Sequence, residues 1–303
     1  MKFTIKILIF LLLTNSAFGI EITDCSPNNS YVVFEEKNRS ILLQKNANEK
    51  IYPASLVKLM TLYLTFEAIE NKKISLNTSI KISQRAEEIS RVNKVNTLHL
   101  RQGQTITVRE AILAIVVRSF NEAAIGLAEI ISNDEWQFVK KMNNKALDLG
   151  MYNSSFRNAS GLHDFSQYTT ALDLARLAMS IKKDFPDYYH LFSLKHFKFH
   201  REKYKTHNHI LDEYRGAEGL KTGFTNASGF NLIASAKKGN IRVISVLIGC
   251  PSSQKRENLT KQLLNEAFKK IPHEIYPDIS GKITKTFSYE DQNINISQDD
   301  DHK

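Results

Sequence analysis

Short hydrophobic stretches rich in β-branched residues lie near both ends of the chain and predict strands. The segments 30–36 and 40–44 are joined by a polar turn, which predicts a β-hairpin near the amino end. Three similar segments follow one another near the carboxyl end: 216–224, 230–236 and 241–248. The Lys-Gly-Asn turn between the last two favours an antiparallel meander.

Helical patterns fill most of the region between these strands. The run from Leu56 to Leu64 is apolar on almost every side, which predicts a helix buried in a core and beginning near Ser55. Thr107 and Glu110 have the spacing of a capping box, which opens a helix over 111–117. Further helices are predicted over 122–131, 136–149, 171–183 and, after the last strand, 257–269.

Strands at both ends with helices between them predict one α/β unit, of the α+β kind. In this fold an all-helical region is inserted into an antiparallel sheet that is built from the two ends of the chain. The chain has 303 residues and is 42% hydrophobic, which is enough for a substantial core. The stretch 71–103 is polar and irregular, and it marks no domain boundary.

The first residues have the pattern of a signal peptide. Basic residues lead into an unbroken apolar run over 7–13, and small residues over 16–19 supply a cleavage site. The run is too short to span a bilayer, and no later segment approaches about 20 apolar residues. We therefore expect an exported protein, periplasmic or secreted and soluble, with a signal peptide at 1–19, one domain at 20–271 and a polar tail at 272–303.

Charge and composition narrow the partners. The formal net charge is +9, and two of these positive charges are lysines of the signal peptide. A basic exported protein can bind an anionic wall polymer or lipid headgroups, and the third alternative is that the charge serves no particular partner. No interleaved basic and aromatic pattern points to nucleic acid. The histidines between 184 and 212, His207 and His209 among them, lack metal-ligand spacing. We expect no metal or cofactor and treat these histidines as surface or core residues.

The two cysteines are Cys25 and Cys250. An oxidising compartment permits a disulfide between them. The sequence leaves open whether the two side chains approach closely enough to form it.

Ser55 and Lys58 are the first candidates for chemistry. They are three residues apart at the start of the predicted buried helix, so their side chains share one helical face. Apolar surroundings lower the pKa of a lysine amine, because its charged form loses hydration, and the neutral amine can then take a proton from a hydroxyl. The alternative is structural, since serine is a preferred N-cap and a buried lysine can extend its amine to solvent.

Two further motifs follow in order. Ser119-Phe120-Asn121 lies 64 residues after Ser55, between two predicted helices, although serine and asparagine are also ordinary capping residues. Lys221-Thr222-Gly223 lies 102 residues further on, in the first strand of the meander. Together with the Ser-x-x-Lys motif, these three are the signature of penicillin-binding proteins and class A β-lactamases.

The sequence around these motifs resembles the low-molecular-mass penicillin-binding proteins that are D-alanyl-D-alanine carboxypeptidases, serine peptidase family S11. The resemblance rests on Pro53–Thr61, Ser160–Leu162 and Gly219–Gly223, and it extends over roughly residues 26–270. It implies a serine β-lactamase/DD-peptidase-like fold and a catalytic domain at 20–271. It also implies penicillin binding and removal of the terminal D-Ala from peptidoglycan pentapeptide stems through an acyl-enzyme.

The same resemblance implies a role for each motif residue. Ser55 would attack the carbonyl of the D-Ala-D-Ala bond, with Lys58 as its base. Ser119 would relay a proton to the leaving amine, and Asn121 would hold the substrate amide. The backbone N–H groups of Ser55 and Phe224 would form the oxyanion hole, where negative charge develops.

The opposite wall of the cleft would bind the terminal carboxylate. Lys221 and Thr222 would contribute a cation and a hydroxyl. Arg256, just before the closing helix, matches the carboxylate-binding arginine of the family and would supply a donor fork, unless it is simply a solvated basic residue. Gly223 would leave room for the substrate along the strand edge.

Two features depart from the family pattern. Phe120 stands where glycine is usual, and we expect it to narrow the cleft or to change which stem peptides fit. Many relatives carry a second β-domain and an amphipathic helix that lies on the membrane. The chain ends too early for both, so we expect no stable membrane anchor after signal cleavage.

Three other functions fit parts of the pattern. A DD-endopeptidase that cuts peptidoglycan cross-links uses the same machinery and remains open. A class A β-lactamase needs a glutamate that activates the deacylating water, and Glu129 comes too early in the chain for that role. An inactive wall-binding protein would keep the fold but lose residues such as Ser55, Lys58 or Lys221, which are intact.

Overall fold

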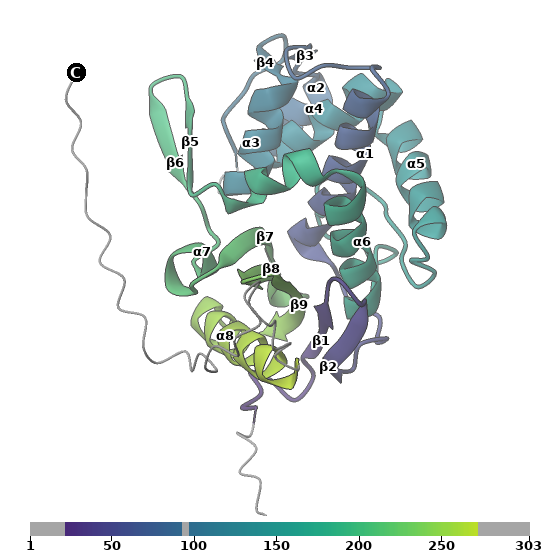
Figure 1. Cartoon of the computed structure of the whole chain (residues 1–303). Coiled ribbons are helices and arrows are strands. Elements are labelled where there is room, and N and C mark those ends of the chain that lie inside the picture. Colours follow the sequence, from purple (N-terminus) through teal and green to yellow (C-terminus); the bar gives the residue numbers. More distant parts are fainter. Residues whose placement is uncertain (1–21, 93–96, 272–303) are drawn as a thin grey trace, which may run out of the picture.

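The computed structural model describes residues 22–92 and 97–271. The expected signal peptide at 1–19 and the polar tail at 272–303 lie outside the described residues. Figure 1 shows a group of helices above the strands of a sheet, with the helix α8 (Ser253–Lys270) beside its last strands. This is the predicted arrangement, because the helical region comes between the first and the last strands of the sheet.

The central sheet has five antiparallel strands in the order β2-β1-β9-β8-β7. Both the predicted hairpin and the predicted meander are confirmed, and β1 pairs with β9, which joins the two ends of the chain. The strands lie at β1 Ser30–Glu35, β2 Ser40–Lys45, β7 Ala217–Thr225, β8 Gly229–Lys238 and β9 Ile241–Cys250.

Both faces of the inner strands are covered. Ile233 and Val246 belong to the core shared with the helical region, whereas Leu232 and Leu247 belong to the core shared with α8. Strands that are buried on both faces have near-continuous hydrophobic runs rather than a clean alternation. The sequences of β8 and β9 contain such runs, which is consistent with their place inside the sheet.

The helical region contains the predicted helices, with shifts of a few residues at their ends. A 3₁₀ turn, η1 (Ala54–Val57), leads directly into the first of them and places Ser55 at the helix start. The predicted capping box of Thr107 and Glu110 is present. The helices lie at α1 Lys58–Glu70, α3 Val108–Arg118, α4 Asn121–Ser132, α5 Glu135–Asp148 and α6 Ala171–Asp184.

The sequence missed the smaller elements. The helix α2 buries only Ala86, Ile89 and Ser90 and is otherwise mostly charged, so its hydrophobic face is too narrow to stand out in a polar stretch. The hairpin of β5 and β6 packs on α3. These elements are β3 Ser79–Lys81, α2 Gln84–Val92, β4 Thr105–Thr107, η2 Pro186–Ser193, β5 His196–Phe199, β6 Glu202–Lys205 and α7 Ile210–Glu213.

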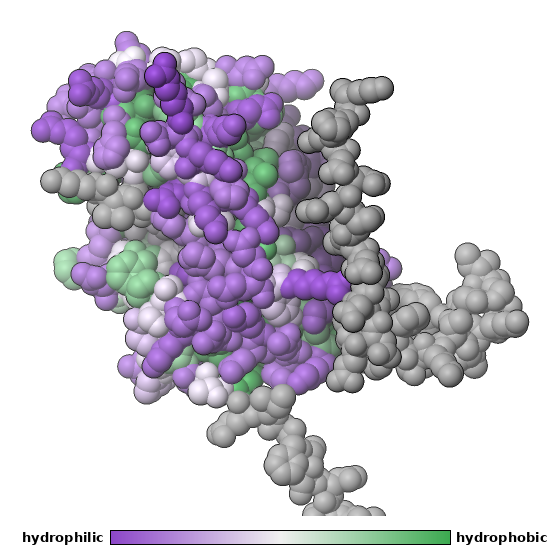
Figure 2. Space-filling model, turned by 90° about the vertical axis from the view of Figure 1, so that its left-hand side faces the viewer, coloured by the Kyte–Doolittle hydropathy of each residue, from purple (hydrophilic) through white to green (hydrophobic). Residues whose placement is uncertain are grey.

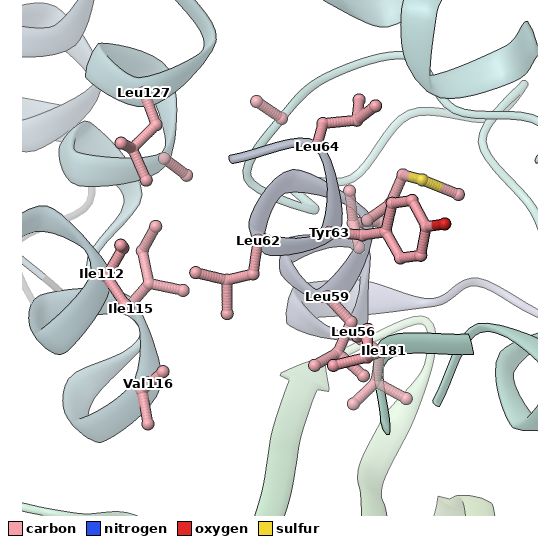
Figure 3. Close-up of a cluster of buried hydrophobic side chains, with 14 of the residues drawn as sticks. Leu56, Leu59, Leu62, Tyr63, Leu64, Ile112, Ile115, Val116, Leu127 and Ile181 are labelled. Carbon is pink, nitrogen blue, oxygen red and sulfur yellow. The ribbon is translucent and has the colours of Figure 1, made fainter. Parts of the chain in front are cut away.

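The helix α1 runs through the middle of the helical core. Ten of its thirteen residues are buried, as its all-round hydrophobic sequence predicts. Figure 3 shows Leu62 pointing from α1 toward Ile112 and Ile115 of α3, while Tyr63 points to the other side. Neighbours on all sides therefore fix α1, and with it the residues at its start.

One face of the molecule can be judged from its surface colouring. The side shown in Figure 2 is mostly hydrophilic, with small hydrophobic areas separated by polar side chains. Within the described residues, every helix is too short or too polar to cross a bilayer.

The structure joins Cys25 and Cys250 in a disulfide, which answers the question that the sequence left open. Their Cα atoms are 5.4 Å apart across a sequence separation of 225 residues. Both cysteines are buried in the core between the sheet and α8. The bond fastens the segment before β1 to the end of β9.

Replacing both cysteines by serine should therefore destabilise the protein. A crosslink across so long a loop removes much conformational freedom from the unfolded chain, and we expect a loss of about 3–5 kcal/mol in the free energy of unfolding. Denaturant titration of the double variant against the oxidised wild type measures this. Equal free energies of unfolding would show that the disulfide does not stabilise the fold.

Candidate active site

A cleft of about 250 Å³ lies between the first strand of the meander and the start of α1. The sequence-predicted residues Ser55, Ser119 and Arg256 meet there, although they come from three distant parts of the chain. The predicted residues that line the cleft are Ser55, Ser119, Thr222, Gly223, Phe224 and Arg256. Lys58, Asn121 and Lys221 are buried and do not line it, but each contacts or influences a residue of the site.

Lys58 is fully buried beside Ser55. Its Nζ lies 3.0 Å from Ser55 Oγ and donates to Asn121 Oδ1 at 2.8 Å and to the backbone carbonyl of Ser160. The oxygens of Asn121 and Ser160 can only accept hydrogen bonds, so they accept them from the two N–H groups of a neutral amine. The lone pair of that amine is then left for the hydroxyl proton of Ser55.

The surroundings of Lys58 favour this neutral form. Burial lowers the pKa of Lys58 well below its ordinary value, and the positive charge of Lys221 lowers it further. The negative charge of Glu122 acts in the opposite direction and raises it. The balance leaves an amine that is able to accept a proton, as we expected from the apolar sequence around Lys58.

The Ser-x-Asn segment connects α3 to α4 in a tight turn. Ser119 ends α3 in the left-handed conformation, with φ at 64°, and its buried hydroxyl has no hydrogen-bond partner within 22–92 and 97–271. An unpartnered buried hydroxyl at a strained position is available to a ligand. Asn121 begins α4 and binds Lys58, while Ser119 lines the cleft together with Ser55.

Of the two effects that we expected of Phe120, narrowing of the cleft is wrong, because Phe120 does not line the cleft. Its side chain is only 1% exposed and turns into the core, where its ring lies 6.4 Å from that of Phe197 and 5.2 Å from that of Tyr204. The left-handed turn at Ser119 directs residues 119 and 120 to different sides. Phe120 instead anchors the β5–β6 hairpin to the helical region.

Strand β7 forms the opposite wall. Lys221 is buried, its Nζ donates to the backbone carbonyl of Thr222 at 2.9 Å, and burial together with the charge of Arg256 lowers its pKa to about 7. Gly223 is close to the start of η1: a Cβ there would lie 3.3 Å from the backbone N atoms of Ser55 and Leu56. Gly223 thus lets strand and helix start approach each other, in addition to any room it gives a substrate.

Arg256 lies within the first turn of α8 rather than before the helix, because α8 begins earlier than predicted. Its side chain is only 5% exposed, pairs with the carboxylate of Glu257 and donates to the carbonyl of Asn231 at 3.4 Å. The Nε atom has no hydrogen-bond partner among the residues described. Arg256 is therefore not a solvated surface residue, and it keeps one donor unused at the cleft.

His207 and His209 also line the cleft, which sequence analysis did not predict. Burial and the nearby positive charges of Arg118 and Lys221 lower the pKa of His207 to about 4, so its ring is neutral at neutral pH. No spacing rule could have found these two residues, since they face the cleft only because of the fold. No group of His, Cys, Asp and Glu within the described parts of the chain is arranged to hold a metal ion.

The fold is that of the penicillin-binding proteins. Penicillin-binding protein 5 from Haemophilus influenzae superposes with a TM-score of 0.76 at 33% identity, covering 79% of this chain and 70% of that one. Penicillin-binding protein D2 from Listeria monocytogenes, solved in an ampicillin-bound form, gives a TM-score of 0.69 at 29% identity, with 79% and 96% covered.

Sequence comparison identifies the family. Residues 23–252 match the model of the D-alanyl-D-alanine carboxypeptidases, peptidase S11, and the chain belongs to this family. The D-alanyl-D-alanine carboxypeptidase DacF of Bacillus subtilis is 34% identical over 257 residues, which is 82% of this chain. The match spans 64% of the length of that relative.

Alanine substitutions at two glycines can test how closely the chain packs around Ser55. Gly161 has φ of +81°, and a Cβ there would lie 2.0 Å from the carbonyl oxygen of Ala54, next to Ser55. Gly103 has φ of +86°, with nothing within 4 Å of such an atom. Both alanine substitutions strain the backbone by about 1–2 kcal/mol, but Gly161→Ala should cost about 4 kcal/mol or more because it also displaces the chain beside Ser55.

Thermal and denaturant unfolding of the two variants measure the difference, and Gly103→Ala is the control for backbone strain alone. Equal losses of stability would mean that the close contact at Gly161 is not a constraint on the site.

Proposed function

We propose that the protein is a serine-type D-alanyl-D-alanine carboxypeptidase that removes the terminal D-Ala from peptidoglycan pentapeptide stems. The observation that carries this proposal is the buried amine of Lys58, 3.0 Å from the hydroxyl of Ser55 in an open cleft. A serine with an adjacent base of lowered pKa is the arrangement that nucleophilic catalysis requires. Membership in the S11 family supports the same reaction.

The acylation step follows from this pair. Lys58 takes the hydroxyl proton of Ser55 while Oγ attacks the carbonyl carbon of the D-Ala-D-Ala bond. The carbon–nitrogen bond then breaks, and the leaving amine receives a proton through the hydroxyl of Ser119. Water hydrolyses the resulting ester and returns Ser55 to its starting state, so the enzyme supplies no net proton or electron.

Backbone donors would stabilise the negative oxygen that forms during attack. The first N–H groups of a helix lack intrahelical partners, and Ser55 lies at the start of η1. We assign its N–H and that of Phe224 in β7 to the oxyanion hole. The close approach of Gly223 to the backbone N atoms of Ser55 and Leu56 supports this assignment, because it brings β7 and the helix start together.

The substrate would be held at both ends of the reacting bond. Asn121 uses its Oδ1 on Lys58, which leaves its amide N–H groups for a substrate carbonyl. Lys221, Thr222 and Arg256 would bind the terminal carboxylate. Arg256 and Thr222 line the cleft, and the buried Lys221 next to Thr222 is close enough to Arg256 for their charges to interact, so positive charge and a hydroxyl would meet a carboxylate there, and charge-assisted bonds to it are strong.

The same cleft would accept β-lactams as acylating inhibitors, since a relative of this fold was solved in an ampicillin-bound form. We further propose that the protein works outside the cytoplasm, in the periplasm or after secretion. The signal-peptide pattern at 1–19 and the disulfide of Cys25 and Cys250 support an oxidising compartment.

The direct test is mass spectrometry of the mature protein after incubation with benzylpenicillin. We expect one penicilloyl adduct on the wild type and on Ser166→Ala, an exposed control serine, and none on Ser55→Ala. An adduct on Ser55→Ala would contradict the proposal. Rapid hydrolysis of the drug without an adduct would indicate a β-lactamase instead.

Defined muropeptides then separate the two peptidase activities. A carboxypeptidase releases free D-Ala from pentapeptide stems, whereas an endopeptidase splits cross-linked dimers. Release of D-Ala from monomeric stems at a higher kcat/KM than cleavage of dimers is the expected result, and the reverse order would favour the endopeptidase.

The proposed carboxylate site should depend on pH. With its pKa at about 7, Lys221 is an ammonium below this pH and a neutral amine above it, so binding of a peptide that ends in D-Ala-D-Ala should weaken as pH rises through 7. We expect a loss of about 10- to 100-fold in total. Calorimetry on the unreactive Ser55→Ala variant measures this dissociation constant.

Arg256→Met should raise the pKa of Lys221, because Arg256 lowers it, and so move this pH dependence upward while weakening binding at every pH. The control is Lys255→Met, an exposed neighbour of Arg256. Affinity that is constant from pH 6 to 9 would exclude Lys221 from the carboxylate site.

A further inference from the structure

Glu122 is a fully buried carboxylate directly after Asn121, in the first turn of α4. Its Oε1 accepts from the hydroxyl of Thr97 at 2.7 Å and from the backbone N–H of Leu98. Thr97 in turn hydrogen-bonds Ser90 of α2. Charged carboxylates are rarely buried unless donors or cations compensate them, so these contacts form a site built for an anion.

The two oxygens of Glu122 differ. Oε1 accepts the hydrogen bonds of both Thr97 and Leu98. Oε2 is buried and has no hydrogen-bond partner in the described parts of the chain. A carboxylate kept only to tie Thr97 and Leu98 to α4 would need one acceptor oxygen, which a glutamine supplies equally well. The charge of Glu122 therefore needs another explanation.

Lys58 supplies that explanation. Asn121, the neighbour of Glu122, binds Lys58 Nζ, and the charges of Glu122 and Lys58 stabilise each other. The other charged and titratable groups whose fields reach this pair are Lys221 in β7, which opposes the charge of Lys58, and Tyr204 in β6. Burial raises the pKa of Glu122, while its hydrogen bonds and Lys58 favour the ionised form.

We propose that Glu122 is a positioning residue that acts through Lys58: its buried carboxylate supplies the negative charge that stabilises the ammonium formed when Lys58 takes the proton of Ser55. This inference rests on the proposed function of Ser55 and Lys58. A buried amine that is too weak a base cannot hold the proton it must receive, and the charge of Lys221 weakens it further. Glu122 opposes both effects in part, without touching the substrate, since it does not line the cleft.

The matched substitution is Glu122→Gln, which keeps an acceptor for Thr97 and Leu98 and removes only the charge. Removing a nearby negative charge lowers the pKa of Lys58. In a plot of the acylation rate against pH, the acidic limb should therefore move to lower pH by about one pH unit. The plateau rate should fall by up to about 10-fold, because the amine becomes a weaker base by about one pKa unit. Stopped-flow acylation of the full mature chain by a chromogenic cephalosporin, from pH 5 to 10, measures both quantities.

Thr97→Val is the control, since it removes one hydrogen bond to Glu122 and leaves the charge. Because it keeps the charge, it should leave the plateau rate and the acidic limb close to those of the wild type. If Glu122→Gln does not fold, Glu122→Asp replaces it: its side chain is one methylene shorter and moves the charge out of its native place, so the limb should move in the same direction by less. A loss of rate with an unmoved limb, or no change at all, would overturn the inference.

The two proposals fail separately. If the wild type is acylated and the acidic limb of the pH–rate profile is unmoved in Glu122→Gln, the inference on Glu122 fails and the proposed carboxypeptidase function is unaffected. If the wild type is not acylated at all, NMR titration of ¹³C-labelled lysine still compares the pKa of Lys58 in the wild type and in Glu122→Gln. Equal values there would overturn the inference independently of catalysis.

Discussion

The burial of Lys58 is the constraint on which the rest of the site depends. An amine taken out of water loses the hydration of its charged form, and it is tolerated only if each polar atom finds a partner. The partners come from separate parts of the chain: Ser55 from η1, Asn121 from the start of α4 and Ser160 from the segment before α6. The catalytic chemistry we propose and the packing of the helical core are thus consequences of the same arrangement.

The sheet holds the other half of the site in place. Because β1 pairs with β9, the strands that follow the helical region return to those that precede it, and β7 comes to lie against the start of α1. Glycines at 161 and 223 make this close approach possible, since a side chain at either position would press on the backbone near Ser55. Phe224, which lines the cleft, is 49% exposed, so the cleft opens to solvent on the side of β7.

Local features of the site could be predicted from the sequence, and long-range features could not. The buried helix after Ser55, the capping box at Thr107 and the meander each have a signal within about a dozen residues. The direction of the Phe120 side chain depends on the left-handed conformation of Ser119, which the residue types around it do not predict. His207 reaches the cleft, and Glu122 reaches Lys58, only through contacts between elements that are far apart in the chain.

The measurement that tests the account most directly is the protonation state of Lys58 in the wild-type protein. NMR of the protein with ¹³C-labelled lysine reports it, and a Lys58→Met variant identifies the resonance. The account predicts that Lys58 has the chemical shift of a neutral amine at a pH at which the exposed lysines are still ammonium groups. A resonance that titrates together with the exposed lysines would contradict it, because Lys58 would then be a cation unable to take the proton of Ser55.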